Sequence, residues 1–232
     1  QPRRTLLIDL RGSESDWLAR MSKTTRHCFK VAVQNDVKAV YSQDIEAFIR
    51  LMQQTGQRAS FGVHSPAYYR RAFELFSPSQ SCALILAQRE GRNLAGVLIF
   101  RHGTRAHYLY GASSGEDRQL NPTYLIQLES MRWAAAHGCE QYDLWGVPDA
   151  DLEALESQFA GRSDGLWGVY RFKRGFGGRL VRTVGAWDLV YAPVRYWLYS
   201  TALRLQARLV SHRGADGSSL GRVPPPTGEV GG

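Results

Sequence analysis

Several short runs of the chain are apolar, or alternate apolar with polar residues, and are bounded by turn residues, which predicts β-strands. The predicted strands cover residues 5–10, 37–41, 83–88, 94–101, 106–112 and 140–145. Turn residues separate the third, fourth and fifth runs, so residues 84–112 are expected to form an antiparallel meander. Two later runs, 179–183 and 184–190, are expected to form a final strand or hairpin.

Other stretches repeat apolar residues every three to four positions, which predicts helices. These helices are expected over residues 13–21, 23–34, 43–54, 121–137, 151–159 and 194–210, with a further helix beginning at residues 65–66. Ser13 precedes two acids, Pro66 and Pro122 suit first helical positions, and Gly138 suits a helix end. Two helices, then a meander, then strand–helix–strand predict an α/β fold with a mixed sheet.

The bulk composition adds three constraints. The 232 residues are 44% hydrophobic, which is enough for one or two domains with a real core. The formal charge of +8 favours a polyanionic partner such as nucleic acid, a phosphorylated sugar carrier or anionic lipid, or else reflects an indifferent basic surface. The three cysteines lack metal-ligand spacing and give no disulfide framework, so a reducing compartment is expected.

The segment that is expected to form the functional site lies between residues 141 and 178. Its first part, Tyr142–Val147, is an apolar run broken by glycine and followed by proline, which predicts a buried strand ending in a turn. Its second part, Gly168–Gly178, alternates aromatic and cationic residues and ends in a glycine pair. Cations and aromatics at the end of a central strand predict a rigid wall facing a charged acyl donor or a phosphate-bearing acceptor.

These two segments resemble the signature of the FemABX family, whose members transfer an amino acid from aminoacyl-tRNA to the peptide of a peptidoglycan precursor. Three further stretches, 5–10, 108–114 and 121–125, agree in the same order, so the resemblance runs from about Thr5 to about Tyr199. It implies an acetyltransferase-like (GNAT) mixed sheet flanked by helices. Family members contain two such domains, and this chain is expected to hold the tail of the first and all of the second.

The expected division follows from that resemblance. Residues 1–36 would end a first GNAT-like domain, and residues 37–192 would form a complete one. Residues 193–213 would form a helix that packs back on the first domain, and the Gly-, Ser- and Pro-rich segment 214–232 would be disordered.

The resemblance points first to Lys173, which would stabilise the developing oxyanion and the terminal ribose of the tRNA; a surface lysine on a basic helix is the alternative. Phe172 would pack beneath Lys173 and fix its direction, or would be an ordinary core aromatic. Arg171, Arg174 and Arg179 would contact the tRNA backbone, where cations give affinity without reading sequence. Arg171 and Arg174 point to different faces of one turn, so at most one of them would line the site.

Acceptor binding is expected on the strand before the central helix. Tyr108 and Tyr110 lie two residues apart, so they are expected to share one face of that strand and to hydrogen-bond the acceptor, unless they are core tyrosines. Arg105, or Thr104 if the match is shifted by one residue, resembles the family's basic position near the acceptor diphosphate.

A second anion site is expected where the central helix begins, at Asn121 and Tyr124, because helix N-termini attract anions. Asp143 would be a base or, more simply, would hold backbone N–H groups of the following turn. His107 is expected to be structural or exposed. Acyl transfer from an ester to an amine needs no covalent nucleophile; no Gly-x-Ser-x-Gly motif occurs, and no cysteine has a histidine at a spacing that suggests a catalytic pair.

Aminoacyl-tRNA would be a co-substrate, and no other cofactor or metal is expected. The acceptor would be a nucleotide- or lipid-linked precursor, and the protein is expected to be a cytoplasmic monomer, with possible contact at the inner membrane face. No signal peptide and no apolar run that would span a bilayer are seen.

Three rivals remain. A coenzyme-A-dependent acyltransferase would share the fold, but residues 115–122 lack its glycines and carry a proline. A phospholipid-modifying aminoacyltransferase would usually bring membrane spans. An inactive RNA-binding module would explain the many arginines after residue 166. Arg26 and Lys30 also share a helix face, which is either solvated or contacts phosphate or RNA.

Overall fold

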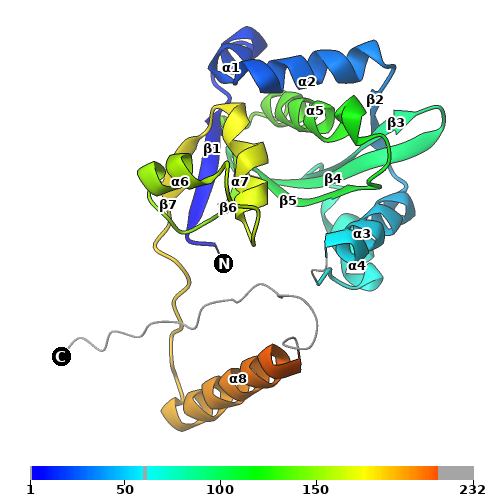
Figure 1. Cartoon of the computed structure of the whole chain (residues 1–232). Coiled ribbons are helices and arrows are strands. Elements are labelled where there is room, and N and C mark those ends of the chain that lie inside the picture. The colour runs from blue at the N-terminus through cyan, green and yellow to red at the C-terminus, as the bar shows by residue number, and fades with distance from the viewer. Residues whose placement is uncertain (1, 60–61, 214–232) are drawn as a thin grey trace. The chain divides into compact units, whose positions relative to one another are not determined.

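The computed structural model describes residues 2–59 and 62–213, and it divides into two compact units after Gly185 (Figure 1). The first unit holds a single seven-stranded sheet in the order β2-β3-β4-β5-β6-β1-β7. The strands are β1 (Arg4–Asp9), β2 (Lys38–Ser42), β3 (Cys82–Arg89), β4 (Arg92–His102), β5 (Arg105–Ser113), β6 (Gln141–Val147) and β7 (Arg179–Arg182). Only β5 and β6 pair in parallel; the other neighbours are antiparallel.

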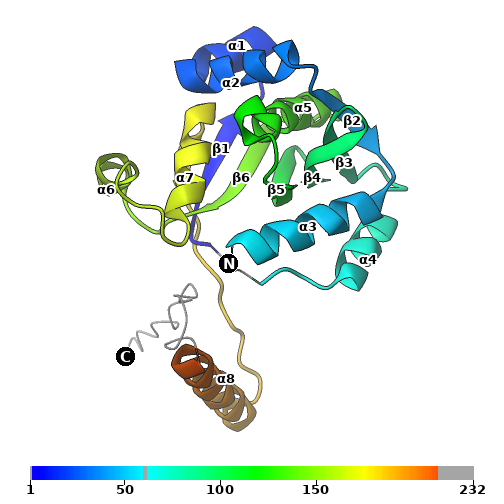
Figure 2. The ribbon, with the colours of Figure 1, turned by 45° about the vertical axis from the view of Figure 1, so that its right-hand side comes forward.

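Helices cover both faces of this sheet (Figures 1 and 2). On one face lie α1 (Glu14–Arg20), α2 (Lys23–Gln34) and α5 (Pro122–Ala136), and on the other lie α3 (Ile45–Ala59) and α4 (Pro66–Phe76). The predicted caps are present: Ser13 and Asp16 form a capping box at α1, and Ser65 accepts from Tyr68 N at the start of α4. The predicted mixed sheet flanked by helices is therefore confirmed.

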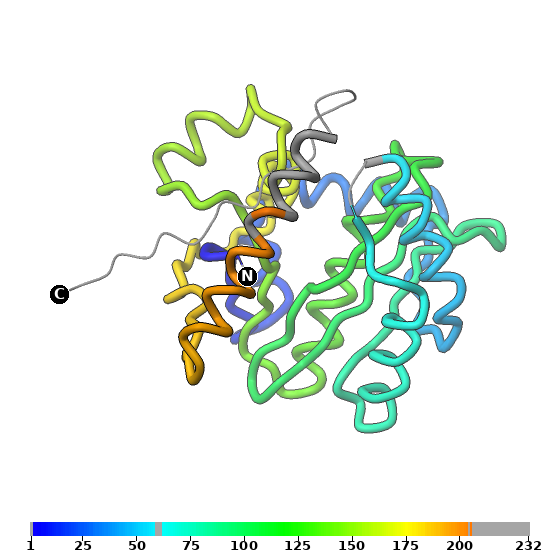
Figure 3. The backbone as a smooth tube through the Cα atoms, turned by 90° about the horizontal axis from the view of Figure 1, so that it is seen from below, coloured from blue at the N-terminus to red at the C-terminus, as the bar shows by residue number. Residues whose placement is uncertain are grey.

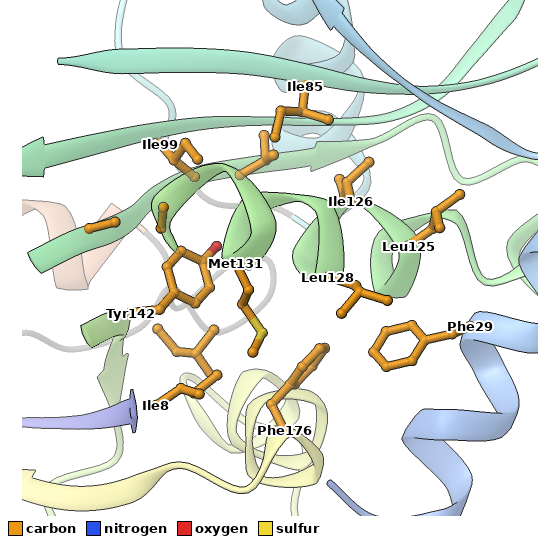
Figure 4. Close-up of a cluster of buried hydrophobic side chains, with 14 of the residues drawn as sticks. Ile8, Phe29, Ile85, Ile99, Leu125, Ile126, Leu128, Met131, Tyr142 and Phe176 are labelled. Atoms are coloured by element: carbon orange, nitrogen blue, oxygen red, sulfur yellow. The ribbon is translucent and has the colours of Figure 1, made fainter. Parts of the chain in front are cut away.

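Each face of the sheet has its own apolar cluster because side chains alternate along the strands. On β3, Ile85 and Ala87 belong to the cluster under α2 and α5, whereas Leu84 and Leu86 belong to the cluster under α3 and α4. Figure 4 shows the first cluster, in which Met131 of α5 lies among side chains from several elements. Met131 is fully buried, so its packing helps to hold α5 against the sheet.

Helix α5 also explains the one parallel pair. Parallel strands need a long crossover, and α5 supplies it between β5 and β6. After β6 the chain makes an excursion with helix α6 (Leu152–Gln158), which projects from the sheet in Figure 3. It returns as α7 (Trp167–Lys173), continued by a 3₁₀ turn, η2 (Arg174–Phe176). A second 3₁₀ turn, η1 (Arg118–Leu120), precedes α5.

Two predicted boundaries need correction. Strand β1 lies between β6 and β7 in the same sheet, so a domain boundary after residue 36 would cut through one unit. Residues 184–190 form no strand: the pairing of β7 with β1 ends at Arg182, opposite Arg4, the first residue of β1.

The second unit contains α8 (Pro193–Arg213), a helix where one was predicted. Its predicted packing on a preceding domain remains a prediction, and the predicted disordered tail lies outside the described residues. No helix within residues 2–59 or 62–213 is long and apolar enough to cross a membrane.

Candidate active site at the bulge in strand β6

The site forms where β5 and β6 stop pairing. Their register joins residues 105–107 of β5 to residues 141–143 of β6, and it ends there although both strands continue. Lys173, the last residue of α7, contacts both strands just beyond this point. Its Nζ donates to Gly146 O at 2.9 Å on β6 and lies 5.7 Å from the ring centre of Tyr108 on β5.

A bulge in β6 presents the Gly146 carbonyl. Strand β1 pairs Thr5 with Gly146 but Leu7 with Asp143, so β6 holds one extra residue across this interval. Trp145 adopts a left-handed φ of +63°, which is strained for a bulky residue. The Asp143 carboxylate offsets this strain, because its Oδ1 accepts from Trp145 N at 2.8 Å and also from the Thr5 hydroxyl.

Lys173 is buried despite its charge, with 5% of its surface exposed. Burial lowers its pKa from the usual 10.5 to about 7, and the nearby Asp143 carboxylate acts in the opposite direction. Lysine has three N–H donors, and across the part of the chain described here only the bond to Gly146 O engages one. The alternative of a surface lysine is therefore wrong: the ammonium is buried beside the Tyr108 ring and keeps N–H groups that no described residue accepts.

Asp143 is the buried acid of the site. Burial raises its pKa, but contacts with His107, Thr5 and Trp145 N outweigh burial and lower it, so the carboxylate stays ionised. His107 Nδ1 lies 3.6 Å from Oδ2, too far for a good hydrogen bond, so the two bonds from Thr5 and Trp145 matter most. The predicted role of Asp143, holding an N–H of the following turn, is confirmed.

Tyr108 and Tyr110 do not share a face, contrary to the prediction. Ile99 pairs with Tyr108 and Leu98 with Tyr110, so Leu109 is an extra residue that reverses the alternation. Tyr108 therefore packs on the cluster beside Lys173, and Tyr110 on the opposite cluster, where its hydroxyl lies 2.7 Å from that of Tyr68.

The Tyr108 ring lies over Gly111. A Cβ added to Gly111 would sit 2.0 Å from the Tyr108 hydroxyl, so only glycine leaves room for this ring position. Burial raises the pKa of Tyr108 to about 12, so its phenol keeps its proton and remains a donor at neutral pH.

Phe172 and Tyr124 belong to an aromatic cluster that joins α7 to α5. Their ring centres are 4.9 Å apart, and Phe172 lies 5.1 Å from Phe176. Phe172 thus anchors the helix that carries Lys173. Asn121 precedes α5 in a left-handed conformation, and its amide donates to Gln119 O instead of capping the helix.

Arg105 lies away from Lys173. It hydrogen-bonds Gln141 at the start of the parallel pair, five residues before Gly146 on β6. At about 3.3 Å per residue, that separation is roughly 16 Å along the strand. The structure therefore does not bring Arg105 to the Lys173 end of the sheet.

Two of the predicted tRNA-binding arginines already have partners. Arg171 donates to Phe159 O and Ala160 O at the end of α6. Arg174 forms a bidentate pair with Glu156. Arg179 is exposed on β7 at the rim of a hollow of about 570 Å³, and no partner for its side chain occurs among the described residues.

Sequence reasoning missed Thr5 and the left-handed Trp145, and it treated His107 as structural or exposed. The only sequence signal was the Trp145-Gly146 break, which indicated irregular backbone but not its geometry. Within the described residues, no group of His, Cys, Asp and Glu side chains has the arrangement of a metal site. The three cysteines are free and buried.

Comparison with protein-family models identifies the family of this chain. The model of the FemAB family matches residues 1–93 and 82–204, which together span most of the sequence. The chain belongs to the FemAB family. Helix α7, strand β6 and Lys173 all lie within the matched residues.

Curated relatives of this FemAB-family chain include lipid II:glycine glycyltransferases. That of Staphylococcus epidermidis (strain ATCC 35984) is 34% identical over 115 residues, and that of Staphylococcus haemolyticus (strain JCSC1435) is 33% identical over 118. These matches cover 48% and 50% of this chain and 25% of each relative. The matched region is thus about a quarter of the length of these relatives.

Solved structures show the same fold. FemX superposes with a TM-score of 0.74 at 20% identity, covering 85% of this chain and 64% of that structure. L-PGS from Bacillus licheniformis gives a TM-score of 0.51 at 12% identity, covering 77% of this chain and 58% of that structure. At these identities the likeness concerns the fold alone.

Proposed function

We propose that this FemAB-family chain transfers an amino acid from aminoacyl-tRNA to the stem-peptide amine of a peptidoglycan precursor. The observation that carries the proposal is the buried Lys173, which keeps free N–H donors where β5 and β6 separate. The names of the staphylococcal relatives, which are glycyltransferases acting on lipid II, support the reaction class.

The chemistry needs few groups. The neutral acceptor amine attacks the ester carbonyl, a C–N bond forms, and the ester C–O bond breaks. The amine's proton ends on the released ribose oxygen. The negative charge that develops on the carbonyl oxygen is stabilised by a positioned donor, which is worth about 10²–10³ in rate.

In this proposal Lys173 is that donor. Gly146 O and the Tyr108 ring hold the ammonium, and its remaining N–H groups face the ester oxygen and the ribose. A low-dielectric surrounding strengthens such a donor, and 5% exposure supplies it. Tyr108, which keeps its phenol proton, would donate a second hydrogen bond to the acceptor.

Asp143 and Thr5 act through Lys173 in the same proposal. Their hydrogen bonds hold Trp145 in the bulge, and the bulge places the Gly146 carbonyl that Lys173 meets. They are positioning residues, because their effect depends on the geometry they impose on the lysine.

The tRNA would approach over the basic surface that includes Arg179. Arg171 and Arg174 contribute by holding α6 and its following turn in place, since their guanidinium groups are engaged there. The acceptor precursor is either nucleotide- or lipid-linked. Coenzyme A is disfavoured as donor, because Pro122 removes one N–H at the start of α5 where pyrophosphate would be held.

The proposal is tested with radiolabelled aminoacyl-tRNA and the two forms of precursor, using this chain alone and within the full product of its gene. Label is expected to move to the precursor, and excess acetyl-coenzyme A is expected to leave the rate unchanged. Transfer of acetyl groups, with no transfer from charged tRNA in either context, would overturn the proposal in favour of an acetyltransferase.

A further inference from the structure

A hollow of about 350 Å³ opens between α1, α2 and α5, on the first unit and outside the site around Lys173. Its volume lies near the lower end of the range for small-ligand pockets, about 300–1,000 Å³. The apolar side chains that line it are Leu18, Phe29, Val33 and Leu128. Val33 also lines the hollow and is exposed over 62% of its surface, so an apolar ligand in the hollow could reach it.

The two sides of this hollow differ in charge. On the α5 side, Arg132 pairs with both Glu14 and Glu129, so these three groups together carry one net negative charge. On the α2 side, Arg26 donates only to the backbone carbonyls that end α1, and Lys30 is exposed with no partner in the described part of the chain.

Helix α2 therefore presents a one-sided positive edge. Its twelve residues include no aspartate or glutamate, and Lys23, Arg26 and Lys30 follow each other at three- and four-residue intervals along one face. An apolar hollow beside such an edge matches a ligand with an apolar chain attached to an anionic head.

We propose that this hollow and the basic edge of α2 bind an anionic phospholipid at a membrane surface. The acyl chain enters between Leu18, Phe29 and Leu128, and the headgroup phosphate lies against Lys30 and Arg26. Basic residues near an anionic bilayer each contribute to binding, and apolar burial adds a separate contribution.

Nucleic acid fits this surface less well. A phosphodiester backbone would use the cations of α2, but it has no group that gains from burial among leucine, phenylalanine and valine side chains. The proposal is independent of the proposed transfer reaction, since it concerns a different part of the unit.

The test is co-sedimentation of the full chain with phosphatidylcholine vesicles that contain or lack phosphatidylglycerol. Binding is expected only to the anionic vesicles and is expected to weaken with salt. Lys30→Glu is expected to reduce vesicle affinity at least fivefold, about the effect of one basic residue at such a surface. Val33→Ser is expected to reduce affinity without changing the salt dependence.

Matched controls lie on α4, which covers the opposite face of the sheet. Arg71→Glu makes the same charge change, and Leu75→Ser replaces a residue with 54% exposure. Both are expected to bind vesicles as the parent does. Equal binding to neutral vesicles, no binding by the parent, or equal losses in all four variants would overturn the proposal. Binding of tRNA that falls with Lys30→Glu but not with Val33→Ser would make α2 a nucleic-acid surface and would overturn it too.

Discussion

Replacing Lys173 by methionine should make the protein more stable at low pH while it abolishes the proposed activity. Methionine keeps the apolar stem and removes the ammonium, whose Nζ is buried beside Gly146 O. The pKa of Lys173 falls from 10.5 to about 7 on folding, which corresponds to about 5 kcal/mol against burying the charged form. Losing the bond to the Gly146 carbonyl costs about 1–3 kcal/mol, so the net stabilisation is roughly 2–4 kcal/mol.

The pH dependence gives this prediction its sign. Below pH 7 both the folded and the unfolded state hold the lysine proton, so the cost of burying charge is fully present. Between about 7 and 10.5 only the unfolded state keeps the proton, so the stability of the parent rises with pH. The advantage of Lys173→Met should therefore be largest near pH 6, should reach zero between about pH 8 and 10, and should reverse above that, because the lost hydrogen bond then outweighs the cost of burying charge.

Thermal unfolding over this pH range measures the effect. A gain of 2–4 kcal/mol should raise Tm near pH 6 by roughly 5–15 °C for a chain of this size. Lys38→Met is the control, because Lys38 is exposed on β2 and should unfold with the parent's pH dependence. Parallel Tm curves for Lys173→Met and the parent would show that Lys173 is not buried as a charged group, and the reasoning would fail.

Three further predictions concern the site. Because the charged ammonium of Lys173 stabilises a developing oxyanion better than the neutral amine does, kcat/KM should fall as pH rises through about 7, and Lys173→Arg should remove that fall from the profile even if the rate is lower. Asp143→Asn removes a charge that raises the pKa of Lys173, so the fall in kcat/KM should move to lower pH. A pH profile identical to the parent's would show that the Asp143 charge does not affect the pKa of Lys173. Gly111→Ala should displace Tyr108 and reduce the rate of transfer at least tenfold. Denaturant titration should show a loss in the free energy of unfolding that is smaller than the loss in activation free energy. Full activity would show that transfer does not depend on the position of Tyr108.

The fold was largely predictable because it depends on side-chain period. The continuous apolar run of β3 is buried on both faces of the sheet, and the helical spacing of apolar residues in α3 buries one face of that helix; both patterns can be read directly from the sequence. Caps such as Ser13 and Ser65 fixed helix starts to within one residue. The predicted continuation over residues 184–190 was wrong, because the run itself cannot show that its partner strand β1 begins at Arg4, opposite Arg182.

The site was only partly predictable, because bulges break the same period. Lys173 was identified from a motif, and its burial depends on a carbonyl supplied 27 residues earlier. The extra residue Leu109 places Tyr108 and Tyr110 on opposite faces, and no local pattern predicts it. The left-handed Trp145 depends on Asp143 and on the distant Thr5, which become neighbours only in the folded sheet.

The central claim is that the Lys173 ammonium takes part in aminoacyl transfer. Its most direct test is the single-turnover rate of amino-acid transfer from charged tRNA to the precursor by the full gene product, comparing Lys173→Met with Lys38→Met. We predict a rate at least 100-fold lower for Lys173→Met, in line with the loss of one oxyanion donor, and an unchanged rate for Lys38→Met. A Lys173→Met rate within a few-fold of the parent, in a protein that unfolds cooperatively, would contradict the account.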